Sequence, residues 1–147
     1  VDKAQIPKGL IAVVANTPFD FNTAHKIGEN IDAGNLQLAI GHGYDHNYVL
    51  NKPAPNLLSL AARATGNVTG IFLEVLTTEP GIQFYTGNFM DGTNTFKSGV
   101  KDNFRTAFAL ETQHFPNSPN QPSFPSTRLN PGSTFRSATV YRFGIYC

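Results

Sequence analysis

Several features that would assign a chain to a functional class at once are scarce in this sequence of 147 residues. Its one cysteine is Cys147, so no disulfide can form within the chain. Only 14% of the residues are charged, the formal net charge is +1, and lysines and arginines form no cluster, which argues against nucleic-acid binding. No apolar run approaches the roughly 18 residues that a membrane-spanning helix needs. We therefore expect one folded domain that binds neither nucleic acid nor a membrane.

The motifs of common cofactor and metal enzymes are also missing. The sequence contains no phosphate-binding loop, no dinucleotide fingerprint and no nucleophile elbow. Its histidines lie at positions 25, 42, 46 and 114, spread through predicted loops and strand ends. His42 and His46 are four residues apart but not in a predicted helix, and no histidine pairs with cysteines in the way typical of metal ligands. We therefore expect no metal site.

Strand signals dominate the features that are present. The sequence has 12 Phe and 5 Tyr, and these occur with Val, Ile and Thr in short runs between turn clusters rich in Gly, Pro and Asn. Short, regularly spaced runs of this kind predict an all-β fold, an antiparallel sandwich or barrel. Strands are predicted at residues 9–15, 36–40, 44–50, 57–64, 70–78, 82–85, 105–113 and 134–146. Helix signals are confined to residues 22–31 and to 57–64, where a strand fits equally well.

Three of the predicted strands each present one polar side chain next to aromatic residues. Because alternate residues of a strand share a face, Gln83 is predicted to point away from Ile82 and Phe84. Asp45 and Glu111 hold similar positions in their own strands. Carboxylate and amide groups bind hydroxyls and aromatic rings cover C–H surfaces, so together the three residues indicate a sugar site. Considered alone, each of the three residues is explained better as a solvated strand residue than as a sugar ligand, and Asp45 also fits an Asx turn.

Five segments of the sequence occur in the order found in one enzyme family. They are TPFDF (17–21), GYDHNYVL (43–50), LEVLTTEPGIQFYTGNF (73–89), ALETQHFPNSPNQPSFPS (109–126) and LNPGSTFRSATVYRFG (129–144). Through them the chain resembles the galactose mutarotase (aldose 1-epimerase) family, whose enzymes are about twice this length. The resemblance implies that residues 1–147 are the C-terminal portion of a single antiparallel β-supersandwich domain. It also implies interconversion of the α and β anomers of a free aldohexose, such as galactose or glucose, without a cofactor.

The same resemblance implies a role for each of the three polar residues. Glu111, in LETQ, matches the family's catalytic base, while Asp45, in GYDHN, and Gln83, in PGIQFYTGN, match ligands of sugar hydroxyls. The family's general acid is a histidine in a motif similar to NHSYFNL, which this sequence lacks, so the chain alone is expected to be a weak or inactive isomerase. A carbohydrate-binding module without turnover is the alternative function. An enzyme acting on hexose 6-phosphates is a weaker interpretation, because the basic residues are scattered.

The resemblance also leads to expectations about partners and location. The sequence opens at Val1 rather than at a methionine, which suggests a cleavage product or a partial sequence. Half of a continuous sandwich would expose strand edges and apolar surface, so the expected partner is the N-terminal half as a separate chain, or a second copy in a homodimer. A cytoplasmic location is expected, or a secreted one if the sequon at Asn67 carries a glycan.

Overall fold

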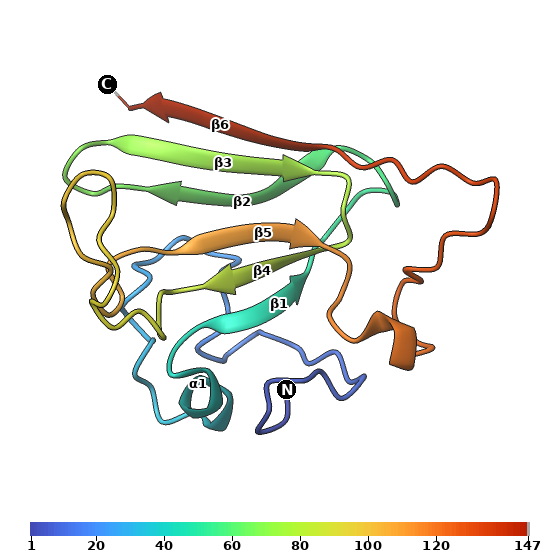
Figure 1. The fold of residues 1–147 in the computed structure, drawn as a ribbon, viewed down its shortest axis with the longest axis horizontal. Helices are drawn as coiled ribbons and strands as arrows, with labels where there is room; N and C mark the ends of the chain where they lie inside the picture. Colours follow the sequence, from blue (N-terminus) through green and yellow to red (C-terminus); the bar gives the residue numbers. More distant parts are fainter. Residues whose placement is uncertain (147) are drawn as a thin grey trace. The chain divides into compact units, whose positions relative to one another are not determined.

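The computed structural model describes residues 1–146, and these divide into two compact units. Residues 1–46 and 84–109 form the first unit; residues 47–83 and those from 110 onward form the second. Six strands and two short helices occur in the described chain (Figure 1). In chain order they are α1 (Leu36–Gly41), β1 (Asp45–Val49), β2 (Ser59–Thr65), β3 (Ile71–Thr77), β4 (Gly81–Tyr85), β5 (Ala109–Gln113), the 3₁₀ helix η1 (Ser118–Asn120) and β6 (Thr139–Ile145). The prediction of an antiparallel, nearly all-β fold is confirmed.

The second unit contains a complete three-stranded sheet of order β2-β3-β6. Strand β3 pairs antiparallel with both neighbours, and its register with β6 runs from Ile71 opposite Ile145 to Thr77 opposite Thr139. Val75 lies at the centre of β3 and is fully buried. On the opposite side of β3, Glu74 is also buried. An alternating strand in mid-sheet therefore buries an apolar residue on one side and a carboxylate on the other.

The other sheet has the order β1-β4-β5. Along β4, Ile82 and Phe84 are 4% and 8% exposed, whereas Gln83 and Tyr85 are half-buried. This alternation confirms the predicted separation of Gln83 from its apolar neighbours onto opposite sides of the strand.

The core of the first unit is an aromatic cluster. Tyr44, which is completely buried, stacks on Phe84 with ring centroids 5.4 Å apart and meets Phe21 edge to face at 5.1 Å. The Tyr44 hydroxyl donates a hydrogen bond to the carbonyl of Pro18 at 2.8 Å, so its polar group is satisfied inside the core. Phe108 adds an edge contact to Phe84 at 6.3 Å.

Three predictions of secondary structure are wrong, and all three fall in the first unit. Residues 9–15 form no strand, because no described strand pairs with them, and residues 22–31 form turns rather than a helix. Residues 36–40 belong to the helix α1 rather than to a strand. Its ends explain the error: the Asn35 side chain accepts a hydrogen bond from the backbone N–H of Gln37, and His42 ends the helix in the left-handed conformation (φ 54°).

Strands β5 and β6 are shorter than the predicted ranges 105–113 and 134–146. Among residues 1–146, no helix is long and apolar enough to cross a membrane.

Candidate functional site

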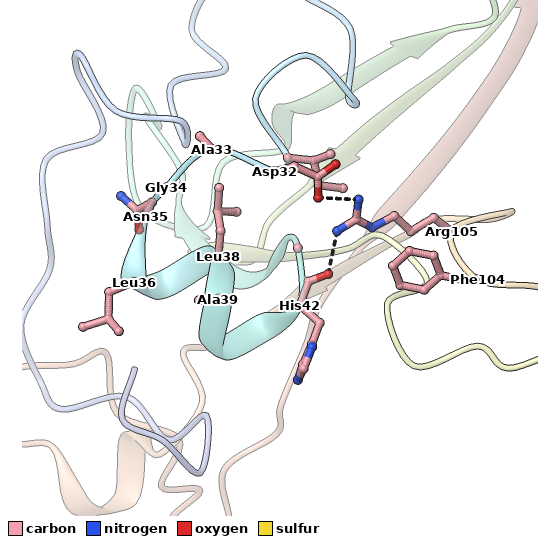
Figure 2. A pocket seen from close by; sticks show the side chains of 12 residues that line it. Asp32, Ala33, Gly34, Asn35, Leu36, Leu38, Ala39, His42, Phe104 and Arg105 are labelled. Atoms are coloured by element: carbon pink, nitrogen blue, oxygen red, sulfur yellow. Dashed lines mark hydrogen bonds and ion pairs between the residues drawn. The ribbon is translucent and has the colours of Figure 1, made fainter.

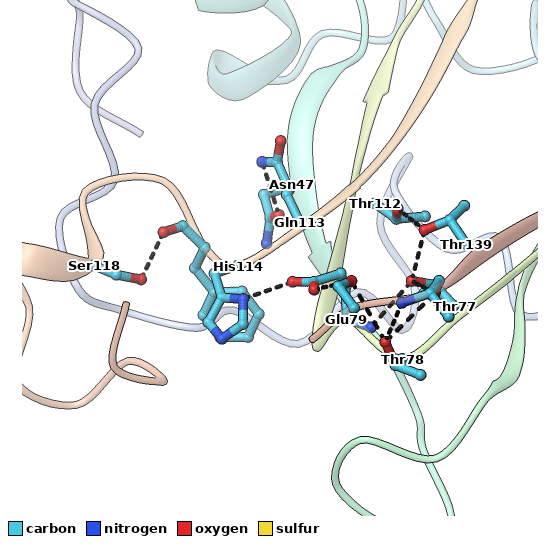
Figure 3. Close-up of polar contacts among 12 residues, drawn as sticks. Asn47, Thr77, Thr78, Glu79, Thr112, Gln113, His114, Ser118 and Thr139 are labelled. Atoms are coloured by element: carbon cyan, nitrogen blue, oxygen red, sulfur yellow. Dashed lines mark hydrogen bonds and ion pairs between the residues drawn. The ribbon is translucent and has the colours of Figure 1, made fainter. Parts of the chain in front are cut away.

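A glycine brings polar side chains together on one side of β4. A Cβ atom at Gly81 would lie 2.8 Å from Oδ1 of Asn47 and 2.9 Å from Cδ1 of Phe115, so both side chains lie directly over this residue. Only glycine leaves them this room. Gln113, at the end of β5, donates a hydrogen bond from Nε2 to Oδ1 of Asn47 at 3.3 Å (Figure 3). Gly81 and Gln113 therefore face the same side of the two neighbouring strands.

This arrangement fixes the side on which two of the predicted site residues lie. Gln83 follows Gly81 by two residues on β4, and Glu111 precedes Gln113 by two residues on β5. Because strand side chains alternate with a period of two, Gln83 and Glu111 point to the side that carries the Asn47–Gln113 pair. The structure thus brings Gln83 and Glu111 together on one face of adjacent strands in the second unit.

Asp45 is the first residue of β1 and belongs to the first unit. Its backbone N–H donates a hydrogen bond to Nδ1 of His46 at 3.1 Å. Burial lowers the pKa of His46 from 6.5 to about 4, so this imidazole is neutral at physiological pH. The ring also meets Phe19 edge to face at 4.8 Å, which marks it as part of the packed interior.

The three glutamates of the second unit have different surroundings. Glu74 is 5% exposed and binds two arginines, Arg63 at 3.1 Å and Arg142 at 2.6 Å from Nε. Glu79 is 7% exposed and is also bound on both oxygens. Glu111 is exposed, and its carboxylate makes no hydrogen bond or ion pair with any residue of the described chain. Glu111 is therefore the glutamate of this unit that remains available to an external ligand.

Glu79 and His114 form a pair that sequence analysis missed. Nδ1 of His114 lies 2.6 Å from one carboxylate oxygen of Glu79 (Figure 3). The hydroxyl of Ser137 donates to the other oxygen at 2.5 Å. The backbone N–H of Glu79 donates to Oγ1 of Thr77 at 3.0 Å. These contacts tie the turn before β4 to the end of β5. The signal in the sequence was the charge in the EPG turn, but the separation of 35 positions between the partners hid the pairing.

The histidines of the described chain are all engaged in local packing or hydrogen bonds. His25 stacks on Phe21 at 4.5 Å, and His42 meets Phe89 edge to face at 5.5 Å. His46 and His114 have the contacts given above. Within residues 1–146, no group of three His, Cys, Asp or Glu side chains could hold a metal ion.

The first unit has an open hollow of about 500 Å³ beside α1 (Figure 2). Arg105 crosses it, donating from Nη1 to Asp32 and from Nη2 to the carbonyl of His42, both at 2.8 Å. His42 and Arg105 both adopt positive φ angles, 54° and 57°; such angles are uncommon for residues other than glycine, although His, Asn and Asp adopt them more often than the rest. None of the residues predicted to bind sugar lines this hollow.

Comparisons with known proteins agree on one family. A family model described as aldose 1-epimerase matches residues 1–142. Galactose mutarotase of Rattus norvegicus is 39% identical over 145 residues, which is 99% of this chain and 40% of that protein. Aldose 1-epimerase of Escherichia coli K12 is 34% identical over 145 residues, covering 97% of this chain and 41% of that protein.

A solved structure is also similar. The crystal structure of a GalM/aldose epimerase homologue from C. elegans matches with a TM-score of 0.80 and 28% identity, over 99% of this chain and 42% of that chain. The chain thus spans about two fifths of the length of the relatives that it matches.

Proposed function

Because this chain belongs to the aldose 1-epimerase family, we propose that it is part of an enzyme that interconverts the α and β anomers of free aldohexoses such as galactose and glucose. Glu111 is the catalytic base of this proposal, and Gln83 and Asp45 bind sugar hydroxyls. No cofactor takes part. The observation that carries the proposal is the shared face of β4 and β5, on which the exposed, unpartnered Glu111 lies on the same side as Gln83.

The proposed reaction needs only proton transfers. Glu111 takes the proton from the C1 hydroxyl while an acid protonates the ring oxygen O5, and the C1–O5 bond breaks to give the open aldehyde. Rotation about C1–C2 presents the other face of the carbonyl. The ring then closes as O5 attacks C1, O5 loses its proton, and protonated Glu111 returns a proton to the C1 oxygen. A carboxylate on an open strand face can carry out both transfers because no arginine or histidine of the described chain binds it.

The sugar ligands have a different task. An amide such as that of Gln83 both donates and accepts hydrogen bonds, which suits a hydroxyl. The carboxylate of Asp45 accepts hydrogen bonds from hydroxyls, and its assignment rests on the motif GYDHN. Held by such contacts, the sugar would present C1 within reach of the base.

We propose that the general acid lies outside these 147 residues. His114 has its Nδ1 bound to Glu79, and His46 is half-buried with a lowered pKa, so neither resembles an acid poised beside Glu111. The relatives are about two and a half times as long as this chain, and the part of them that this chain does not match is the proposed source of the acid.

The exposed apolar surface of the first unit supports the binding of a partner chain. Leu10, Ile11 and Val13 are 85%, 54% and 81% exposed. Within the described chain, residues 8–13 make no backbone hydrogen bonds. An extended apolar segment in this state could pair with another strand. We propose the N-terminal half of the same protein as that strand's source, with a homodimer as the competing outcome.

Polarimetry combined with calorimetry tests the function. The chain is expressed alone and together with the preceding part of its gene product, and fresh α-D-galactose is added to each. We expect rapid mutarotation with the combined protein and little with the chain alone, because the acid is missing from the latter. Sugar binding without mutarotation by the combined protein would identify a binding module instead. If the combined protein shows no sugar binding and no mutarotation, both functions are refuted. Size-exclusion chromatography with light scattering distinguishes a heteromeric complex from a homodimer.

The cellular location remains a prediction. The chain between β2 and β3 exposes Asn67, and Val68 next to it is 90% exposed, so the sequon is accessible. Intact mass measurement of the native protein separates the two expected locations: an unmodified Asn67 fits a cytoplasmic protein, and a glycan there requires secretion.

A further inference from the structure

We infer that the amide pair Asn47–Gln113 determines sugar specificity, by binding one hydroxyl of the sugar held between Gln83 and Glu111. The inference rests on the proposed function and adds two residues to it. The relevant residues all belong to the second unit.

The position of the pair supports this role. Gln113 lies two residues beyond Glu111 on β5, and the side chain of Asn47 lies over Gly81, two residues before Gln83 on β4. Two residues along a strand correspond to about 7 Å. The pair therefore borders the Gln83–Glu111 face at one end, at a separation that the hydroxyls of a single hexose can span.

The hydrogen bonding of the pair leaves groups available for a ligand. Nε2 of Gln113 donates to Oδ1 of Asn47 at 3.3 Å, and Nδ2 of Asn47 makes a long contact of 3.4 Å with the carbonyl of Tyr48. In the described chain no residue donates to Oε1 of Gln113. An amide has two donor hydrogens and a carbonyl acceptor, so Gln113 can accept a hydrogen bond from a hydroxyl while it holds Asn47. Both side chains are half-buried, which leaves them reachable.

The pair is held in place from two directions. Asn47 and Phe115 fill the space over Gly81, where any side chain would collide with them. Directly after Gln113, His114 binds Glu79 at 2.6 Å, which anchors the end of β5. A hydrogen-bonding pair that cannot shift will favour a sugar with a hydroxyl at the matching position and disfavour an analogue without one.

The pair is also uncharged, and this defines the class of ligand. Neutral amides bind hydroxyl groups well but do not compensate the charge of a phosphate. The preferred substrate at this end of the site is therefore a neutral sugar, and a phosphorylated one is disfavoured.

The test uses the combined protein of the polarimetry experiment described above. It measures the mutarotation of galactose, glucose and singly deoxygenated galactoses by this protein. The parent protein is compared with Gln113→Leu, which has nearly the same size and no hydrogen-bonding group. We expect one deoxy sugar to be disfavoured about three- to tenfold in kcat/KM by the parent, the usual range for one neutral hydrogen bond. In Gln113→Leu this penalty disappears, while ratios for the other deoxy sugars stay unchanged. The loss is expected in KM rather than kcat, because the contact persists from ground state to transition state.

Thr112→Val is the matched control. Thr112 points to the opposite side of β5 and shares a hydrogen bond of 2.6 Å with Thr139. Loss of this hydrogen bond should therefore lower kcat/KM for all the sugars by the same factor. If Gln113→Leu does not fold, Gln113→Asn keeps the amide but withdraws it from the hydroxyl, with the same expected change. Unchanged ratios in a folded Gln113 variant, or the same change of ratios in Thr112→Val, would overturn the inference. Failure of the parent protein to mutarotate any sugar would instead overturn the proposed function, and the inference with it.

Discussion

The two units of the chain are stabilised in different ways. The first unit packs aromatic rings around Tyr44 and is built largely from turns and irregular segments, with a single turn-and-a-half of helix. The second unit has a regular antiparallel sheet and two buried glutamates, Glu74 in the sheet and Glu79 in the turn before β4, each bound by several partners. The comparison shows how the glutamates of the second unit differ: Glu74 and Glu79 are satisfied internally, whereas Glu111, the proposed base, is exposed on the strand face.

The aromatic core of the first unit should be the site most sensitive to mutation. Phe84 is 8% exposed and contacts Tyr44, Phe21 and Phe108. We expect Phe84→Ala to lower the free energy of unfolding by about 3–5 kcal/mol, because it removes ring contacts and leaves a cavity. Urea denaturation followed by circular dichroism measures the loss. Phe89, which is 54% exposed, provides the control, and a similar cost for Phe89→Ala would show that the burial of Phe84 is not what matters.

The same unit should lose stability in acid because of His46. Burial lowers its pKa to about 4, whereas in the unfolded chain the pKa is near 6.5, so the unfolded state binds this proton at a higher pH. The stabilisation is complete above pH 6.5, decreases as the pH falls, and is lost near pH 4; the total is about 3 kcal/mol at 1.36 kcal/mol per pKa unit.

Urea titrations at pH 7.5, 5.5 and 4.5 of the wild type and His46→Gln measure this contribution. The difference in unfolding free energy between the two proteins should shift in favour of the variant as the pH falls. A difference that stays constant over this range would contradict a buried, neutral His46.

The sheet of the second unit should depend on charge rather than on rings. Glu74→Gln keeps the size of the side chain but weakens its hydrogen bonds to Arg63 and Arg142. We expect a cost of about 2 kcal/mol, typical of hydrogen bonds to charged groups, because both arginines are exposed enough to remain hydrated. Glu111→Gln, on an exposed and unpartnered glutamate, should change stability by less than about 0.5 kcal/mol. Equal costs for the two variants would remove the distinction between them.

A smaller loss of stability than that of Glu74→Gln is expected when a single hydroxyl of the first unit is removed. Tyr44→Phe removes the hydrogen bond to the Pro18 carbonyl and leaves the ring in place. Loss of a neutral hydrogen bond costs about 1 kcal/mol, which thermal unfolding can measure. A neutral or stabilising result would mean that the ring contacts alone hold Tyr44.

The contrast between the units also explains which structural features could be predicted from the sequence. The runs of strand-forming residues at 44–50, 57–64, 70–78 and 82–85 predict strands, and each overlaps an observed strand, β1 to β4, that pairs within the chain. Residues 9–15 have the composition of a strand but no partner, and residues 36–40 are too short a run for periodicity to distinguish helix from strand. Residues 36–40 form a helix that begins at the N-cap Asn35, and this cap is a local hydrogen bond rather than a periodic pattern.

The candidate site was predictable to a similar extent. Alternation placed Gln83 opposite Ile82 and Phe84, and the family resemblance supplied the roles of Glu111 and Asp45. The pairs Asn47–Gln113 and Glu79–His114 join residues 66 and 35 positions apart, and nothing local in the sequence indicates such contacts. Gln83 and Glu111 point to the same side because β4 and β5 are adjacent strands of one sheet, and only the fold shows this adjacency.

The central claim is that Glu111 acts as the base of an aldose 1-epimerase. Its most direct test is the initial rate of α-D-galactose mutarotation, measured by polarimetry for the wild type, Glu111→Gln and Glu74→Gln in the mutarotating protein. Removal of a general base typically lowers a rate about 10²- to 10⁴-fold. We predict a loss of this size for Glu111→Gln with sugar binding retained, and a rate close to that of the wild type for folded Glu74→Gln. An unchanged rate in Glu111→Gln would contradict the claim.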